Sequence, residues 1–335
     1  MPTPKPLAST LRQRLNPQTI GLVLTAAMVL LYIAGLPLLE IMELKTYDQR
    51  LQRFAQRVPA GDVVIAAIDE KSLATQGRWP WSRGTMAELV KRIDTLGAKA
   101  IVFDVFFSEA ENRGALAQIA RLEAEQGVTD KTASPYRAVK RALATDAAFA
   151  AAIADSGKVV LASVFLLDEA EARHLSPEEH TRARASIDEH AVPTIRQSGG
   201  GSMHDWPALR ARGAVVNLPE LTRGARYVGH INSMSDRDGT VRWAPLVIQY
   251  GDTFYPSADV QAVRLYQGDA PLAMHADSGG IAGLEIGRQF ISTDEAGRVL
   301  IRYHGPAGTI PTTSVADIFA CSIAPTVVKD KIVFI

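Results

Sequence analysis

The first pattern along the chain is an uncharged apolar run at residues 20–39. An α-helix rises about 1.5 Å per residue, so this run reaches about 30 Å, the thickness of the hydrocarbon core of a bilayer. Lys5, Arg12 and Arg14 precede it. The pattern predicts an uncleaved transmembrane signal anchor with its N-terminus in the cytoplasm. A buried core helix is the alternative interpretation.

An amphipathic pattern follows the apolar run. Leu44, Tyr47, Leu51 and Phe54 recur at helical spacing, which predicts a juxtamembrane helix that continues outward from the anchor. Proline and glycine end this pattern. We therefore divide the chain into a basic cytoplasmic segment at residues 1–19, the anchor at 20–39, the juxtamembrane helix at 40–58 and an extracytoplasmic domain at 59–335.

Apolar, β-branched runs then alternate with helical patterns. Residues 63–68, 100–107 and 158–167 have the continuous apolar character of strands that are buried on both faces. Residues 85–96 place apolar side chains at helical spacing, and residues 145–155 form an Ala-rich helical pattern. This alternation indicates a right-handed βαβαβ core of parallel strands.

A turn signal divides a later apolar segment. The tetrad Asp-Arg-Asp-Gly at residues 236–239 separates strand-like runs at 227–234 and 240–250, which predicts an antiparallel hairpin. Further patterns predict a helix that begins at Pro256 and ends at residue 266, and short strands at 289–292 and 299–303. The predicted fold class is α/β: a mixed sheet with a parallel βαβαβ core and an antiparallel hairpin, preceded by an N-terminal transmembrane helix.

Two polar stretches interrupt this order. Residues 110–143 are charged and helical in pattern, which predicts an insertion packed on the outside. Residues 168–212 predict a long loop with a short charged helix. Five histidines lack the regular spacing of metal ligands, and we interpret them as solvated loop residues: His174, His180, His190, His204 and His230.

The final five residues, 331–335, predict a buried strand. No helix or turn follows this strand to cover it. We therefore expect the chain to be a fragment of a longer domain and its last strand to be poorly held.

Composition narrows the classes of function. Lys and Arg together number 36 and Asp and Glu together number 36, so the net charge is zero, which excludes a general nucleic-acid binder. Hydrophobic residues make up 47% of the chain, and a packed core is expected. The single cysteine, Cys321, excludes an internal disulfide and a multi-cysteine zinc site. We predict no cofactor and no resident metal.

Three carboxylates form the first candidate site. Asp69 and Glu70 lie at the carboxyl end of the first predicted strand and Asp104 at that of the second, where ligands of open α/β sheets bind. As oxygen ligands they suit a divalent cation, so a periplasmic metal-dependent hydrolase is an alternative function. The structural alternative is that Asp69 caps the next turn while Asp104 pairs with Arg78 or Arg83.

An aromatic loop forms the second candidate site. Pro80 restricts the loop that carries Trp79 and Trp81, and Arg83 lies just before a predicted helix. The two indoles suit a lid over a ligand or partner, with Arg83 binding an anion. The alternative is that both indoles pack over the sheet. Together with Asp69, Glu70 and Asp104, these three side chains are the predicted ligand-binding residues, and no residue is predicted to be catalytic.

Seven segments in order carry a resemblance to a known family. The chain resembles the CHASE2 domain, a family of extracytoplasmic sensors, from residue 42 to residue 335. The resemblance rests on TYDQR at 46–50, VVIAAIDEKSL at 63–73, GRWPWSR at 77–83, GAKAIVFDVFFSE at 97–109, GHINSMSDRDGTVRWAPL at 229–246, YHGPAGT at 303–309 and KDKIVFI at 329–335.

The resemblance implies a sensor that regulates a cytoplasmic output domain beyond residue 335, first of all an adenylate or guanylate cyclase. A histidine kinase or a Ser/Thr kinase is the alternative output, and an inert module that only dimerises its output domain is a further alternative. The resemblance also implies that the chain lies in a bacterial inner membrane, with most of its residues in the periplasm. The expected partners are the membrane, an unidentified small extracytoplasmic ligand and a second copy bound through the juxtamembrane helix.

Overall fold

The computed structural model describes residues 16–33, 37–54, 61–126 and 134–335. The chain divides into two units. The first contains Met1–Gln56 together with Asp236–Thr240, and the second contains Arg57–Ser235 and Val241–Ile335.

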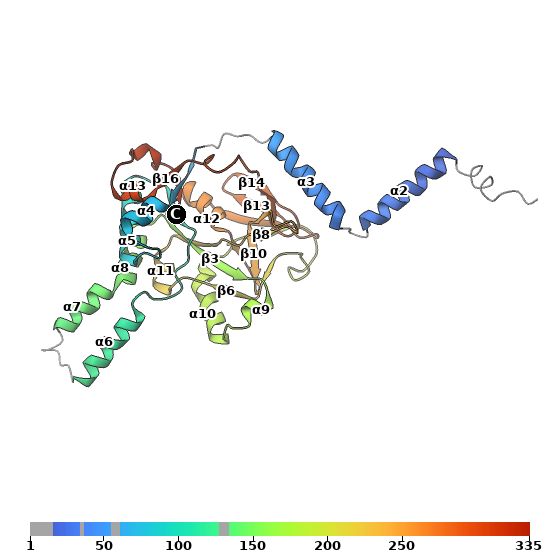
Figure 1. Ribbon diagram of the computed structural model, residues 1–335. Helices are drawn as coiled ribbons and strands as arrows, with labels where there is room; N and C mark the ends of the chain where they lie inside the picture. The colour runs from blue at the N-terminus through green and yellow to red at the C-terminus, as the bar shows by residue number, and fades with distance from the viewer. Residues whose placement is uncertain (1–15, 34–36, 55–60, 127–133) are drawn as a thin grey trace, which may run out of the picture. The chain divides into compact units, whose positions relative to one another are not determined.

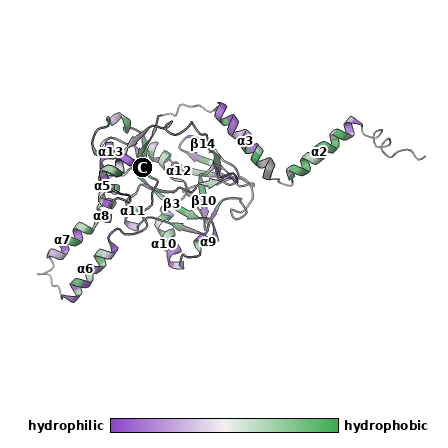
Figure 2. Cartoon of the chain, viewed as in Figure 1, coloured by the Kyte–Doolittle hydropathy of each residue, from purple (hydrophilic) through white to green (hydrophobic). Residues whose placement is uncertain are grey.

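The first unit contains the helices α2 (Pro17–Ile33) and α3 (Pro37–Phe54). Figure 2 shows α2 as almost uniformly hydrophobic, whereas α3 carries many hydrophilic residues. In the part of the chain that the structure describes, no helix combines the length and apolar character needed to cross a membrane. The predicted span at residues 20–39 includes residues 34–36, which lie outside the described residues. Of the predicted juxtamembrane helix at 40–58, residues 40–54 are helical in α3, and residues 55–58 lie outside the described residues.

The second unit is built around a seven-stranded sheet (Figure 1). Its strands follow in the order β16 (Thr312–Ser314), β1 (Val63–Ala67), β17 (Ile332–Phe334), β2 (Ala100–Phe103), β3 (Val159–Leu166) and β6 (Gly213–Val215), and β7 (Tyr227–His230) also pairs with β3. All these pairs are parallel except that of β3 with β6. The predicted parallel core is therefore confirmed, although β2 ends at Phe103 rather than at residue 107.

The strand at the end of the chain lies inside the sheet. Val333 is opposite Val64 of β1 on one side and opposite Ile101 of β2 on the other, and its side chain has no exposed surface. The expectation of an uncovered final strand is wrong, because helices pack on both faces of the sheet at this position. Because β17 lies between them, β1 and β2 are not neighbours in the sheet, although they are consecutive strands in the chain.

Helices cover both faces of the sheet. On one face α5 (Arg83–Thr95) packs against α8 (Thr145–Ser156), and the shorter helices α4 (Glu70–Gln76), α11 (Pro219–Gly224) and α13 (Val315–Phe319) lie beside them (Figure 1). The other face is covered by α12 (Ala258–Tyr266), which contacts β2, β3 and β7. The predicted helices over residues 85–96 and 145–155 are confirmed.

Smaller sheets build a second core from the later part of the chain. One sheet has the order β14 (Gln289–Ser292), β13 (Ile281–Ile286), β12 (Leu272–Ala276) and β4 (Ile195–Gln197); another has β11 (Thr253–Pro256), β10 (Val247–Tyr250) and β5 (Arg210–Ala211); a third has β15 (Arg298–Leu300), β9 (Val241–Pro245) and β8 (Met234–Ser235). Trp206, Phe254 and Met274 are buried among them.

The structure differs from the predicted hairpin at 227–250 and from the predicted helix at 256–266 in one detail each. The hairpin is formed by β8 and β9, whereas β7 leaves it and joins the central sheet, because its buried residues complete the pairing of β3. The helix does not begin at Pro256: this residue ends β11, and the hydroxyl of Ser257 caps α12 by accepting a hydrogen bond from the Val260 amide, 3.2 Å.

The two polar stretches, residues 110–143 and 168–212, differ in outcome: the first agrees with its prediction, and the second contains more regular structure than predicted. In residues 110–143 the structure places α6 (Arg113–Glu125) and α7 (Ser134–Leu143) side by side, and α6 buries no side chain, which confirms an external insertion. The prediction of a long loop at 168–212 is wrong, whereas the short charged helix predicted within it is confirmed as α10 (Pro177–Ile187). This stretch also contains α9 (Glu169–Ala172) and the 3-10 helix η1 (Asp188–His190) besides β4 and β5.

Helix α10 forms because its start is capped and one face is apolar. The Ser176 hydroxyl accepts from the Glu179 amide and the Glu179 carboxylate accepts from the Ser176 amide, and Ala183 and Ile187 are buried. His190 at the end of η1 and His230 at the end of β7 are also buried, so the interpretation of these two histidines as solvated is wrong. A second 3-10 helix, η2 (Pro325–Val327), precedes β17.

Candidate functional site

Asp69 acts as a helix cap. Its Oδ1 accepts hydrogen bonds from the Ser72 amide at 2.9 Å, the Ser72 hydroxyl at 2.7 Å and the Ser314 hydroxyl at 2.8 Å. These donors, led by the Ser72 hydroxyl, hold the pKa of Asp69 below its usual value. The capping interpretation is confirmed. Glu70 is exposed in the first turn of α4.

The two indoles of the aromatic loop pack against the protein. Trp81 is 5% exposed, and its Nε1 donates to the Gly77 carbonyl at 2.9 Å. Its ring meets those of Trp79 and Phe319 edge-on, with centroids 5.7 Å and 6.2 Å apart. The peptide bond between Trp79 and Pro80 is cis. These contacts support the packing interpretation, and a ligand role for the indoles stays a prediction.

Arg83 is engaged away from Asp104. Its Nε lies 3.2 Å from the Asp146 carboxylate, its Nη2 donates to the Glu109 carbonyl at 3.1 Å, and its guanidinium lies 4.5 Å from the centroid of the Phe107 ring. The predicted pairing of Arg83 with Asp104 is wrong, because α8 packs against α5 and presents Asp146 to it.

Asp104 lines a cavity of about 240 Å³ in the second unit. This Asp104 cavity lies where β2 and β7 end, beside the first turn of α12. A second carboxylate, Asp259 of α12, also lines it. The surrounding wall is largely apolar and includes Val102, Ile231, Trp243, Ile301 and Phe334.

Backbone pairing holds Asp104 at this edge. The Asp104 amide donates to the Ile335 carbonyl at 3.0 Å, and the Ile335 amide donates to the Val102 carbonyl at 2.9 Å. The final strand thus extends the β2 ladder to the residue that carries the carboxylate. The position of Asp104 therefore depends on the C-terminal strand.

A close approach of α12 to β7 positions Asp259. A Cβ added to Gly229 would lie 2.5 Å from the Ala258 nitrogen, so only glycine permits this spacing. Gln261 Nε2 donates to the carbonyls of Val228 at 3.2 Å and His190 at 3.1 Å. The helix is therefore fastened directly to the sheet, with Asp259 in its first turn.

The loop after β7 is held by a side chain that substitutes for a strand. Asn232 Oδ1 accepts from the Phe165 amide at 2.9 Å, and Asn232 Nδ2 donates to the Phe165 carbonyl at 2.7 Å. Ile231 and Ser233, on either side of Asn232, both line the cavity. This wall is therefore fixed to β3.

The two carboxylates of the cavity lack a counter-charge among the described residues. No Lys or Arg lines the cavity, and within the described residues neither the Asp104 nor the Asp259 carboxylate has a hydrogen-bond or ion-pair partner. Both side chains meet solvent from the cavity. The surrounding protein nevertheless desolvates them and raises the pKa of each, and the Asp104 charge further raises that of Asp259.

His230 contributes no charge. Its ring is fully enclosed and lies against Phe165, with centroids 6.0 Å apart. Burial lowers the pKa of His230 to about 3, so the ring is neutral at physiological pH. Among the described residues, no three His, Cys, Asp or Glu side chains are arranged to hold a metal ion. The predicted carboxylates Asp69, Glu70 and Asp104 therefore do not form a three-residue metal site.

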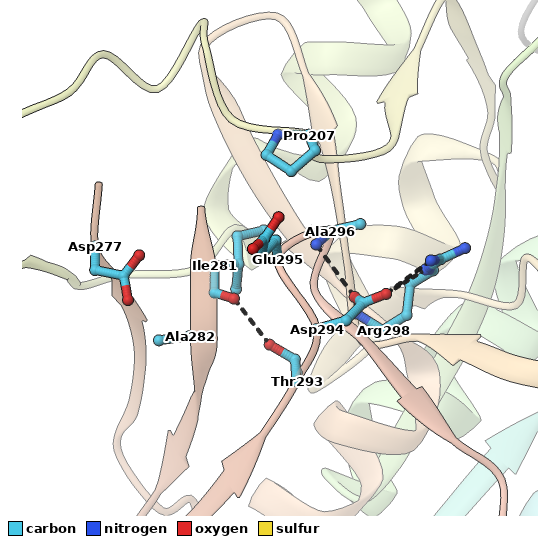
Figure 3. A pocket seen from close by; sticks show the side chains of 9 residues that line it. All are labelled: Pro207, Asp277, Ile281, Ala282, Thr293, Asp294, Glu295, Ala296 and Arg298. Carbon is cyan, nitrogen blue, oxygen red and sulfur yellow. Dashed lines mark hydrogen bonds and ion pairs between the residues drawn. The ribbon is translucent and has the colours of Figure 1, made fainter. Parts of the chain in front are cut away.

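A wider depression of about 610 Å³ lies in the second core region (Figure 3). Asp294 lines it, but its carboxylate is bound to Arg298 at 2.7 Å and to the Ala296 amide at 3.1 Å. Thr293 donates its hydroxyl to the Ile281 carbonyl at 3.3 Å. Because Arg298 lines this depression and supplies a counter-charge, whereas no described Lys or Arg lines the Asp104 cavity, the Asp104 cavity is the stronger candidate.

Of the six predicted ligand-binding residues, only Asp104 lines the Asp104 cavity; the other five lie outside it. The sequence reasoning missed Asp259. The available signal was ambiguous: a carboxylate in the first turn of a helix is common because it favours the helix dipole. Only the packing of α12 against the sheet brings Asp259 beside Asp104.

Comparison with known proteins bears on the identity of the chain. The model of the family described as the CHASE2 domain matches residues 23–335. This match agrees with the resemblance carried by the seven segments. No curated protein and no solved structure matches the chain.

Proposed function

Because the chain belongs to the CHASE2 family of extracytoplasmic sensor domains, we propose that it senses a small extracytoplasmic molecule bound in the Asp104 cavity. The observation that carries this proposal is the cavity itself, which two carboxylates line at the edge of the sheet and which no Lys or Arg of the described residues lines. Ligands of open α/β sheets commonly bind at such an edge.

The proposed sensor is anchored in the bacterial inner membrane by residues 20–39, with its bulk in the periplasm. The uncharged run and the basic residues before it support this orientation. Binding regulates a cytoplasmic output domain, first of all an adenylate or guanylate cyclase, with a histidine or Ser/Thr kinase as the alternative. A second copy binds through α3, whose apolar residues recur at helical spacing.

The test blocks the cavity and measures ligand response. Ser233→Phe places a large side chain at the cavity wall, and Ser278→Phe makes the same change at an exposed position outside that wall. The full chain in lipid nanodiscs is screened by thermal shift against a library of small metabolites. We expect a saturable shift without turnover that Ser278→Phe keeps and Ser233→Phe loses.

Two results contradict this function. Turnover of a compound by the purified chain supports the hydrolase instead. A saturable shift that survives Ser233→Phe in a folded protein places the ligand elsewhere.

A further inference from the structure

We propose that the Asp104 cavity recognises a small organic cation: an amine with an apolar body. This inference rests on the proposed ligand role of the cavity and adds the chemical class of the ligand. It requires the ammonium group to lie between the carboxylates of Asp104 and Asp259, with the apolar body against the wall.

The charge of the cavity carries the first step. Asp104 and Asp259 line the same small space; burial raises the pKa of both carboxyl groups, and the Asp104 charge further raises the pKa of Asp259. Among the described residues no Lys or Arg lines the wall to offset this charge, and His230, which does line it, is neutral and buried with neither ring nitrogen hydrogen-bonded. A cationic ligand supplies the missing counter-charge and forms charge-assisted hydrogen bonds with both carboxylates.

The apolar wall is the second argument, because it favours an organic cation over a metal ion as the ligand. Calcium takes six to eight oxygen ligands and magnesium an octahedron, whereas much of this wall is apolar, including Val102, Ile231 and Phe334. Within the described residues no third carboxylate or histidine joins the pair as a metal ligand. An apolar wall instead gains free energy by burying hydrocarbon.

The size carries the third step. A volume of about 240 Å³ lies below the range of about 300–1,000 Å³ that is usual for drug-sized ligands. The cavity therefore suits a compact ligand with one amine and one small ring or short chain.

The test compares two isosteres. Calorimetry on the full 335-residue chain in lipid nanodiscs measures the binding of phenethylamine and of 2-phenylethanol at pH 7, with empty nanodiscs as the blank. We expect saturable binding of the amine and at least about tenfold weaker binding of the alcohol. A tenfold change corresponds to about 1.4 kcal/mol, an ordinary value for one charge-assisted contact.

Matched variants locate the cation. Asp104→Asn and Asp259→Asn should each weaken amine binding by about tenfold or more, because each keeps the side-chain shape and removes one charge. Asp277→Asn, an exposed aspartate outside the cavity, should leave amine binding unchanged. Circular dichroism checks that every variant is folded.

Four results overturn the inference: no amine binding, equal binding of both isosteres, amine binding unaffected by both Asn variants, or competition by calcium chloride at millimolar concentration. These results are distinguishable from failure of the proposed function. If 2-phenylethanol binds as well as the amine and Ser233→Phe abolishes both, the cavity is a ligand site but its ligand is not a cation. If Ser233→Phe leaves all binding intact in a folded protein, the ligand role of the cavity itself fails.

Discussion

At the scale of single residues, three aspartates at the edge of one sheet have different environments. Asp69 accepts three hydrogen bonds, which lower its pKa, whereas Asp104 and Asp259 are desolvated without a partner among the described residues, which raises theirs. A raised pKa contributes stability below the unfolded value, and this contribution is lost as the pH rises through the folded value. For Asp69 the sign is opposite, since its contribution is lost as the pH falls.

The first prediction concerns this difference in sign. The raised pKa of each carboxyl group means that its negative charge destabilises the folded state, so Asp259→Asn should raise the melting temperature at pH 7, by about 1–3 °C because solvent in the cavity screens the charge. At pH 3 the difference from the parent protein should shrink, because the carboxyl groups are then largely protonated. Thermal denaturation followed by circular dichroism at both pH values measures it.

Asp69→Ala provides the opposite control. It should lower the melting temperature at pH 7 and do so less at pH 3, where the carboxylate that accepts the Ser72 bonds is partly protonated. If Asp259→Asn destabilises the protein at pH 7, the carboxylate has a stabilising partner and the unpaired description is incorrect.

At the scale of elements, the contact between α12 and β7 determines the shape of the Asp104 cavity. Gly229 lies against the backbone of Ala258, and the first turn of α12 carries Asp259. The same glycine lies in a segment that resembles the family, GHINSMSDRDGTVRWAPL. A close approach between two backbones accounts for a glycine at this position.

The second prediction tests this close approach. Gly229→Ala should destabilise the fold by about 1–3 kcal/mol, because the added methyl group overlaps the α12 backbone and forces the helix away. Gly114→Ala is the matched control: no heavy atom lies within 4 Å of its added Cβ, and the site is in a helix, where alanine is favoured. Urea unfolding compares the two, and equal effects would contradict the assigned role of Gly229.

The C-terminal strand is the second decisive element, because it pairs with β1 and β2 at once. The third prediction is that Val333→Asp abolishes cooperative folding, since it buries a charge with no partner in the centre of the sheet. Lys329→Asp, at an exposed position just before the strand, should change the unfolding free energy by less than about 1 kcal/mol. Denaturant unfolding measures both, and a cooperative transition in Val333→Asp would show that β17 is dispensable.

At the scale of the whole molecule, the proposed orientation across the membrane rests on Lys5, Arg12 and Arg14 before the apolar run. The fourth prediction is that alkaline phosphatase fused after Glu43 is active, whereas a fluorescent protein that matures only in the cytoplasm is dark at the same position. Reversing the charge of the three basic residues should weaken this orientation. A bright cytoplasmic reporter after Glu43 in the parent protein contradicts the proposed topology.

The sequence by itself determined the local features, because these depend on near neighbours in the chain. Continuous β-branched runs predicted β1 and β3, and helical spacing predicted α5, with Leu89 and Ile93 fully buried. The residues that cap helices were partly visible as well: Asp69 follows an apolar run directly. The family resemblance was equally readable, since it rests on short segments in a fixed order.

Only the tertiary structure decided which distant segments meet. The periodicity of β17 predicts a strand but cannot say that the strand enters between β1 and β2, because parallel pairing depends on contacts far apart in the chain. For the same reason Arg83 pairs with Asp146 rather than with Asp104, because the packing of α5 against α8 brings the two side chains together. Asp259 lines the Asp104 cavity because α12 packs against Gly229. This contact joins segments that are distant in the sequence, so no local pattern could predict it.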